Sequence, residues 1–262
     1  MPSLYAHYRF GNQILPMLPA DVRQPIQRCR RLFDMGLHGP DFFFYHSYLT
    51  QTPIVQLGTQ IHDQTGKEFF TRCCSHLREA PSEEALAYLY GILAHYCLDS
   101  ACHPFVYDQT DDGPVSHASL ETDFDRHLLT LDGYEKPYTY DNTTHLKLYR
   151  DDYATIAAFY PEVSPEDIRR CIHSMNLATK LLATPSTAFR GLVAGFLKLA
   201  SEDVRGMLMH KDANPACTQM IGQLMYLYNQ ALENFPEYLD QLCSHMTYNA
   251  PLGDLFTASF NR

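Results

Sequence analysis

The sequence predicts an all-α protein, folded as a single-domain multi-helix bundle of 262 residues. Apolar residues recur at spacings of three and four along almost the whole chain, and alternation with a period of two is scarce. Hydrophobic residues make up 45% of the chain, which is ample for one core. No linker or internal repeat divides the sequence, so we expect one domain over residues 1–262.

In the first half, helices are predicted over residues 3–17, 20–35, 54–78, 82–102 and 115–132. Ser82 precedes Glu83 and Glu84, and a capping hydroxyl followed by acidic residues suits the positive end of a helix dipole. Pro104 disfavours helical geometry at the preceding residue, so this helix is expected to end near residue 102. Residues 36–53 and 107–114 are predicted as irregular segments.

In the second half, helices are predicted over residues 152–159, 165–182, 186–209, 214–234 and 236–246. Ser164 precedes Pro165 and two acidic residues, which is a helix-start signal, and Asn214 before Pro215 is interpreted in the same way. Residues 131–142 are predicted as a loop.

Composition and charge exclude several classes of protein. The net charge of −10 provides no general attraction for nucleic acid, so no nucleic-acid partner is expected. The longest uncharged apolar stretch, residues 85–98, is far short of the roughly 20 residues of a transmembrane helix. We see no signal peptide and expect a cytoplasmic protein with its eight cysteines reduced. No protein partner is evident.

Histidines and carboxylates recur at a spacing of four. His95, Asp99 and His103 would form a polar stripe on an otherwise apolar helix, with metal-ligand character. His117 and Glu121 repeat the spacing, with Asp125 as an expected support for the ligands. For this second set, a solvated face of charged residues is an equally good interpretation.

Three further candidates are single residues. Asp41 lies in a Gly-Pro-Asp turn, and His7 and His62 lie in predicted helices. Taken alone, each is more commonly a structural residue. The loop histidines His38 and His46 are expected to be exposed.

The order of the eight candidates resembles the zinc-dependent phospholipase C family, especially its phospholipase C/D branch. Single-strand-specific zinc nucleases share that helical fold. The four-residue gap from Asp99 to His103 is the usual gap of the phospholipase C/D branch, whereas secreted bacterial phospholipases C have six. The resemblance covers about residues 1–130. Residues 131–262 are expected to be the helical remainder of the same domain. The matched residues are His7, Asp41, His62, His95, Asp99, His103, His117 and Glu121.

The resemblance implies two or three Zn²⁺ ions. His62, His95 and Asp99 would bind one ion together with Asp41. His103, His117 and Glu121 would bind a second. His7, Asp99 and the amino terminus would bind a third if Met1 is removed and Pro2 becomes terminal; if Met1 is retained, this site would be altered or empty. Asp41 would also act as the general base or orient the attacking water.

The expected chemistry is phosphodiester hydrolysis. Three carboxylates against two or three zinc ions leave a positive site, which suits a phosphate ester, and zinc lowers the pKa of bound water. We therefore predict a zinc-dependent phosphodiesterase acting on a phospholipid head group or a small phosphate ester. Phe42 and Tyr45, in the aromatic run after Asp41, are the predicted substrate contacts.

Other interpretations remain open at this point. A nuclease or nucleotidase on the same fold is one, and a non-catalytic, metal-stabilised helical binding protein is another. An ordinary bundle with scattered histidines is the broadest. No amphipathic basic helix or lipidation signal is evident, so a soluble substrate competes with a lipid.

Overall fold

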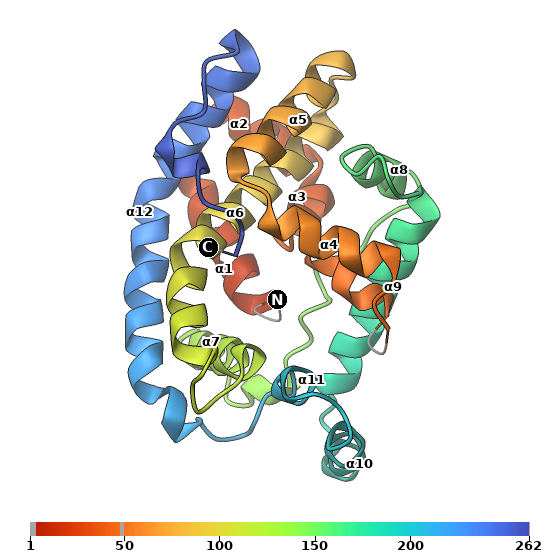
Figure 1. Cartoon of the computed structure of the whole chain (residues 1–262), viewed down its shortest axis with the longest axis vertical. Coiled ribbons are helices and arrows are strands. Elements are labelled where there is room, and N and C mark those ends of the chain that lie inside the picture. Colours follow the sequence, from red (N-terminus) through yellow and green to blue (C-terminus); the bar gives the residue numbers. More distant parts are fainter. Residues whose placement is uncertain (1–3, 48–49, 262) are drawn as a thin grey trace.

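A long apolar helix, α6 (Glu83–Thr110), runs through the middle of the molecule (Figure 1). The computed structural model describes residues 4–47 and 50–261, and within these ranges the chain forms helices and no β-strand. The prediction of an all-α fold is therefore confirmed. Nearly every α6 side chain from Ala85 to Asp99 is buried, because other helices pack around it.

The first three helices position the chain that enters the candidate site. They are α1 (Leu4–Ile14), followed by the 3₁₀ turn η1 (Leu15–Met17), then α2 (Ala20–Arg28) and α3 (Arg30–Gly36). Helix α3 crosses α6 where Gly36 meets Gly91, and a Cβ atom on Gly91 would lie 2.3 Å from the carbonyl oxygen of Phe33. This close crossing fixes the turn after α3 against α6.

The next elements surround the site. They are the 3₁₀ helix η2 (Asp41–His46), α4 (Pro53–Asp63), α5 (Gly66–Glu79) and α7 (His117–Leu131). The single helix predicted over 54–78 is two helices, because Thr65 forms a capping box with Glu68 and starts α5 anew.

The second half of the chain packs around this core. Helix α9 lies against η2, α11 against α7, and α12 along α6, while α10 projects from the body of the molecule (Figure 1). The elements are η3 (Pro137–Thr139), α8 (Asp152–Ala157), α9 (Pro165–Leu182), α10 (Thr187–Leu197), α11 (Glu202–Gly206), η4 (Pro215–Cys217), α12 (Thr218–Tyr248) and η5 (Asp254–Phe256).

Two helices run through prolines at which the sequence predicted an end or a break. Helix α6 continues through Pro104 to Thr110, and α12 continues through Pro236. Both predicted boundaries were wrong. Residues beyond each proline are buried, including Val106 and Leu239, so apolar packing offsets the backbone hydrogen bond that proline cannot make.

The other boundaries are shifted by breaks within predicted helices. Residues 20–35 are interrupted at Cys29, and residues 186–209 form the separate helices α10 and α11. All eight cysteines are free thiols, as expected. Within residues 4–47 and 50–261, no helix combines the length and the apolar character that crossing a membrane requires.

Candidate metal centre

Helix α6 provides the middle of the candidate centre. His95, Asp99 and His103 occupy one stripe of this helix and are at most 4% exposed. Because α6 continues through Pro104, His103 keeps the helical register, and the prediction that it would leave the helix was wrong. The spacing of four therefore places three ligand-type side chains on one face in successive turns.

Four other elements bring ligand-type side chains to this stripe. His7 comes from α1, Asp41 begins η2, and His62 lies in the last turn of α4. His117 and Glu121 lie in the first two turns of α7. His117 is partly exposed, and the other residues of the eight are buried. All eight residues that the sequence indicated are thus gathered in one place.

Two of the three ligand groups share His95. One consists of His7, His95 and Asp99, and the other of Asp41, His62 and His95. In each group the donor atoms lie within 4.8 Å of one another. His7 Nε2 is 3.1 Å from Asp99 Oδ1, and His62 Nε2 is 2.9 Å from Asp41 Oδ1.

The third group consists of His103, His117 and Glu121. Glu121 Oε1 lies 3.2 Å from His103 Nε2 and 3.1 Å from His117 Nε2. His103 Nε2 is also 3.7 Å from Asp99 Oδ1, which connects this group to the other two. Two imidazoles and a carboxylate form a three-ligand set of the kind that leaves a position open for water or substrate on a catalytic zinc ion.

Backbone carbonyls set the orientation of three of these imidazoles. The Nδ1 atoms of His62, His95 and His103 donate to the carbonyl oxygens of Gly58, Leu37 and Phe260, at 2.7, 3.2 and 2.6 Å. A carbonyl oxygen can only accept, so Nδ1 carries the proton and the lone pair of a neutral ring lies on Nε2. Histidine ligands of metal ions in proteins are held in this way.

Two buried side-chain atoms without a hydrogen bond indicate whether these residues fit a metal ion. His95 Nε2 lies 3.0 Å from Asp99 Oδ2, but neither atom makes a hydrogen bond to any described residue. Buried polar atoms are nearly always paired, because an unpaired one loses its solvation without compensation. A cation between these two atoms would satisfy both, so the residues fit a metal ion of the kind that nitrogen and oxygen donors select.

The electrostatics of the centre keep its carboxylates ionised. Burial alone would raise the pKa of Asp99, but the imidazoles of His103, His95 and His7 hold it well below its usual range. Burial would also raise the pKa of Glu121, but that pKa is held well below its usual range, and the imidazoles of His117 and His103 contribute to lowering it. Conversely, Asp99 and Glu121 outweigh burial and raise the pKa of His103 to about 9. The carboxylates thus provide a strong local attraction for positive charge.

A cleft of about 440 Å³ opens beside the third ligand group. Its lining includes three ligand-type side chains, His62 of α4, His103 of α6 and His117 of α7. Asp203 and Val204 of α11 contribute a wall. The other lining residues are Phe44, Tyr45, Ser47, Gln51, Val55, Thr59, Tyr107, Ala118, Met207 and Asn261.

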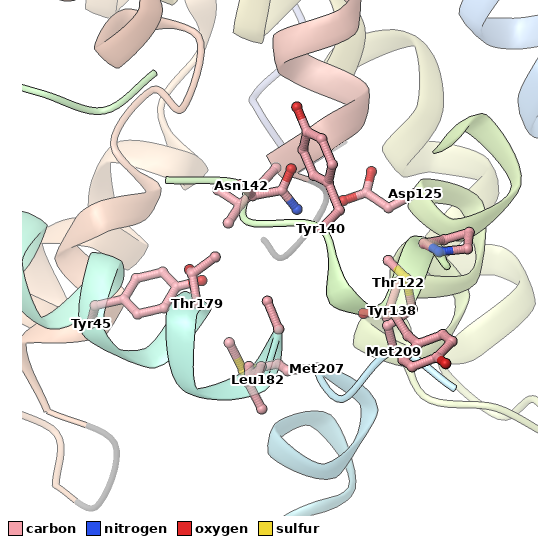
Figure 2. A pocket seen from close by; sticks show the side chains of 13 residues that line it. Tyr45, Thr122, Asp125, Tyr138, Tyr140, Asn142, Thr179, Leu182, Met207 and Met209 are labelled. Atoms are coloured by element: carbon pink, nitrogen blue, oxygen red, sulfur yellow. The ribbon is translucent and has the colours of Figure 1, made fainter. Parts of the chain in front are cut away.

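A smaller cavity of about 50 Å³ adjoins the cleft and shares Tyr45 and Met207 with it. Figure 2 shows Tyr45 and Thr179 on one side of this cavity and Tyr138 and Met209 on the other. The two shared side chains therefore stand between a roomy cleft over the ligand groups and a narrow extension toward α9.

The aromatic substrate contacts are only partly placed as expected. Tyr45 lines the cleft, but Phe42 is fully buried and packs on Phe43 and on the edge of Tyr160. The assignment of Phe42 as a substrate contact is therefore corrected, because its ring belongs to the core. Phe44, two residues along, lines the cleft instead.

Supporting residues also differ from expectation. Asp125 accepts hydrogen bonds from the backbone N–H groups of Tyr5 and Ala6, so it caps α1. His38, expected to be exposed, is fully buried, and its Nε2 atom lies 2.8 Å from that of His145. Met1 and Pro2, the expected amino-terminal contribution to a third zinc site, lie outside the described residues.

Some functional contributions had no signal in the sequence. The carbonyl groups of Leu37 and Phe260 orient two histidines, and any residue type can supply a carbonyl. Asp203 lies 82 residues beyond the last predicted ligand and matches no metal-ligand spacing, so only the packing of α11 on α7 reveals it at the cleft.

Comparison with known proteins agrees with this geometry. The family model for zinc-dependent phospholipase C matches residues 6–179, which extends beyond the 1–130 expected and includes all eight ligand-type residues. Neither the curated proteins nor the solved structures contain a match. Since the model covers well over half of the sequence, the chain belongs to the zinc-dependent phospholipase C family.

Proposed function

We propose that this chain is a zinc-dependent phosphodiesterase that uses water to hydrolyse a phospholipid or a similar phosphate ester. The observation that carries the proposal is that three connected ligand groups lie beside a cleft of about 440 Å³, which is lined by His62 of one group and by His103 and His117 of another. Family membership supports the same class of reaction.

The ligand assignment is part of the proposal. Asp41, His62, His95 and Asp99 would hold one zinc ion, and His103, His117 and Glu121 a second. His7 and Asp99 would hold a third together with the amino terminus. When bound, zinc supplies a Lewis acid for the phosphoryl oxygens and makes water a nucleophile at neutral pH.

Asp41 is the proposed general base or water-orienting residue. Its Oδ1 atom lies 2.9 Å from His62 Nε2 and 3.9 Å from His95 Nε2, so two imidazoles fix the carboxylate. His62 also lines the cleft, which connects this carboxylate to the position of the substrate. Tyr45 and Phe44 provide apolar contacts to the part of the substrate next to the phosphate.

The wall of the cleft favours a small ester or a head group over nucleic acid. Among the described lining residues there is no Lys or Arg, and Asp203 adds a negative charge. Repeated phosphates along a nucleic acid strand would therefore meet no cationic side chain on this wall. A single phosphate would instead be bound by the metal ions that the ligand groups hold.

Metal content and activity should be lost together when a shared ligand is removed. For His95→Ala and Asp99→Ala we expect fewer bound zinc ions in native mass spectra. We also expect at least a roughly thousandfold loss of hydrolysis of a soluble phosphodiester, since metal chemistry supplies most of the rate. His173→Ala, an exposed histidine on α9, is the matched control and should retain both.

The substrate class is tested by comparing a short-chain phospholipid, a chromogenic phosphodiester and single-stranded DNA at equal phosphate concentration. Preference for either of the first two substrates supports the proposal. Preference for the DNA would assign the chain to the nuclease alternative. Full activity in His95→Ala, or a protein that takes up no zinc, would refute a zinc-dependent reaction.

A further inference from the structure

Large apolar side chains are exposed at the end of α9, along α10 and just beyond it. Six of the twelve large hydrophobic side chains that are exposed among the described residues lie in this one region. Three of them, Leu192, Phe196 and Leu199, are 71, 76 and 88% exposed. We call this surface the α10 face, and it consists of Leu177, Leu181, Phe189, Leu192, Phe196 and Leu199.

The α10 face belongs to an anchored helix. Phe189, Leu192 and Phe196 follow spacings of three and four and therefore lie along one side of α10. On the other side, Arg190 is buried and donates to the carbonyl oxygens of Tyr138, Leu182 and Met209. These bonds fix the inner side of α10, so its apolar side faces solvent because of the fold and lacks a partner within the described chain.

The segment that carries this face has a charge balance opposite to that of the whole chain. Residues 168–201 contain five of the 20 Lys and Arg residues and none of the 30 Asp and Glu residues. Arg169 and Arg170 pair with Glu166, and Arg190 is buried. The remaining cations, Lys180 and Lys198, are exposed and make no ion pair with the described residues. An acidic protein thus presents two unpaired cations beside this apolar surface.

The α10 face lies close to the cleft, because α10 contacts the helix that lines the cleft wall. Helix α10 contacts both α9 and α11, and it projects from the body of the molecule beyond α11 (Figure 1). Asp203 and Val204 of α11 line the cleft wall. A surface that touches the α10 face would therefore lie one short helix away from the ligand groups.

We propose that the α10 face docks the protein on an anionic phospholipid bilayer. Exposed Phe and Leu side chains flanked by lysines fit the boundary between acyl chains and negatively charged head groups. The rings and aliphatic side chains would enter this boundary while Lys180 and Lys198 reach lipid phosphates. Docking goes beyond the proposed hydrolysis, because binding to a bilayer requires no reaction.

The test is co-sedimentation of the full chain with vesicles of phosphatidylcholine alone or with about one third phosphatidylglycerol. We expect binding to the mixed vesicles that weakens as salt is raised. Leu192→Ser with Phe196→Ser should lower the ratio of bound to free protein about tenfold or more, since two apolar side chains no longer enter the boundary. Lys180→Glu with Lys198→Glu should remove the preference for anionic vesicles.

The matched control is Tyr248→Ser, which changes an aromatic side chain that is 80% exposed on α12. It should bind vesicles like the parent protein. Each variant must retain its helical circular dichroism and its activity on a soluble phosphodiester, which separates docking from folding and from catalysis. If the parent protein binds the mixed vesicles but hydrolyses none of the substrates, the proposed function fails and the docking proposal stands.

Three results would overturn the docking proposal. The parent protein could fail to bind the mixed vesicles, or the serine variants could bind as well as the parent. The third result is a dimer in sedimentation velocity that the serine variants dissociate, because a second copy of the chain would then cover the α10 face.

Discussion

At the scale of single residues, Gly39 sets the position of His95. Its φ of +45° lies in the left-handed region, and a Cβ atom there would stand 2.2 Å from His95 Cδ2. The same turn carries the Leu37 carbonyl group that accepts from His95 Nδ1, and it leads directly into Asp41. One glycine therefore lets the turn hold a ligand-type imidazole and deliver a carboxylate beside it.

Gly39→Ala should reduce zinc binding as well as stability. The left-handed backbone costs about 1–2 kcal/mol for alanine, and the new methyl group would displace the ring of His95. Gly133→Ala is the matched control, since its φ is also positive at +88° but no atom lies within 4 Å of the added Cβ. Thermal unfolding should show a loss in both variants, and native mass spectrometry a loss of zinc only for Gly39→Ala. Equal zinc content in the two would contradict this role of Gly39.

The sequence was informative about side chains whose chemistry is rare and regularly spaced. The stripe of His95, Asp99 and His103 needs only a helix to align it, so its spacing sufficed to find it. Phe42 was misassigned because an aromatic run does not specify which ring faces the core. That choice depends on contacts with Tyr160, which is 118 residues away.

At the scale of elements, α1 is held in place by carboxylates of α7. Asp125 caps the first turn of α1, and Asp132, seven residues or two turns later, accepts from the Tyr5 hydroxyl group and from Arg9. Asp132 directly follows Leu131, the last residue of α7, and residues seven apart share one face of a helix, so both carboxylates face the same side. His7, between these contacts on α1, is positioned by them.

Asp132→Asn should destabilise the protein in a pH-dependent way. Burial opposes the shift, but hydrogen bonds from Arg9 and Tyr5 lower the pKa of Asp132. Its carboxylate therefore stabilises the fold above the unfolded pKa of about 4, and this contribution disappears as the pH falls through the lower, folded pKa. We expect a loss of up to about 1 kcal/mol in urea unfolding at pH 7, because the pair is partly exposed.

The difference between the parent protein and Asp132→Asn should shrink when unfolding is repeated below pH 4. Asp240→Asn, an exposed change on α12, controls for the loss of one negative charge and should have little effect at either pH. A difference that widens in acid would contradict the stated direction of the pKa shift.

Helix boundaries were the least predictable part of the fold, for one physical reason. Pro104 and Pro236 each remove a local hydrogen bond, which the sequence shows, whereas the burial of Val106 and Leu239 depends on neighbours that it does not show. The break at Thr65 was detectable, since Thr65 and Glu68 form the usual capping-box spacing.

At the scale of the whole molecule, the ligand-type residues join five separate elements. They come from α1, η2, α4, α6 and α7, and His7 and Glu121 are 114 residues apart. A metal ion held by several of these elements would crosslink them, so that metal binding and folding stabilise each other.

Chelation of zinc should therefore lower the melting temperature. Where free zinc exceeds its dissociation constant about a hundredfold, binding adds about 3 kcal/mol to the free energy of unfolding. Differential scanning fluorimetry with and without a chelator measures the shift. In Asp99→Ala the chelator should have a much smaller effect, and an unchanged melting temperature in the parent protein would exclude a structural contribution of zinc.

The bond from His103 Nδ1 to the Phe260 carbonyl oxygen bears on biosynthesis. The ring of Phe260 also packs against His62 and His95, so a segment near residue 260 completes a centre whose first ligand is residue 7. During translation, helices with local contacts can form as they emerge, but this contact must wait until residue 260 has left the ribosome. Until then, His103 lacks its orienting carbonyl group, and the nascent chain should capture zinc in its final arrangement only after residue 260 has emerged.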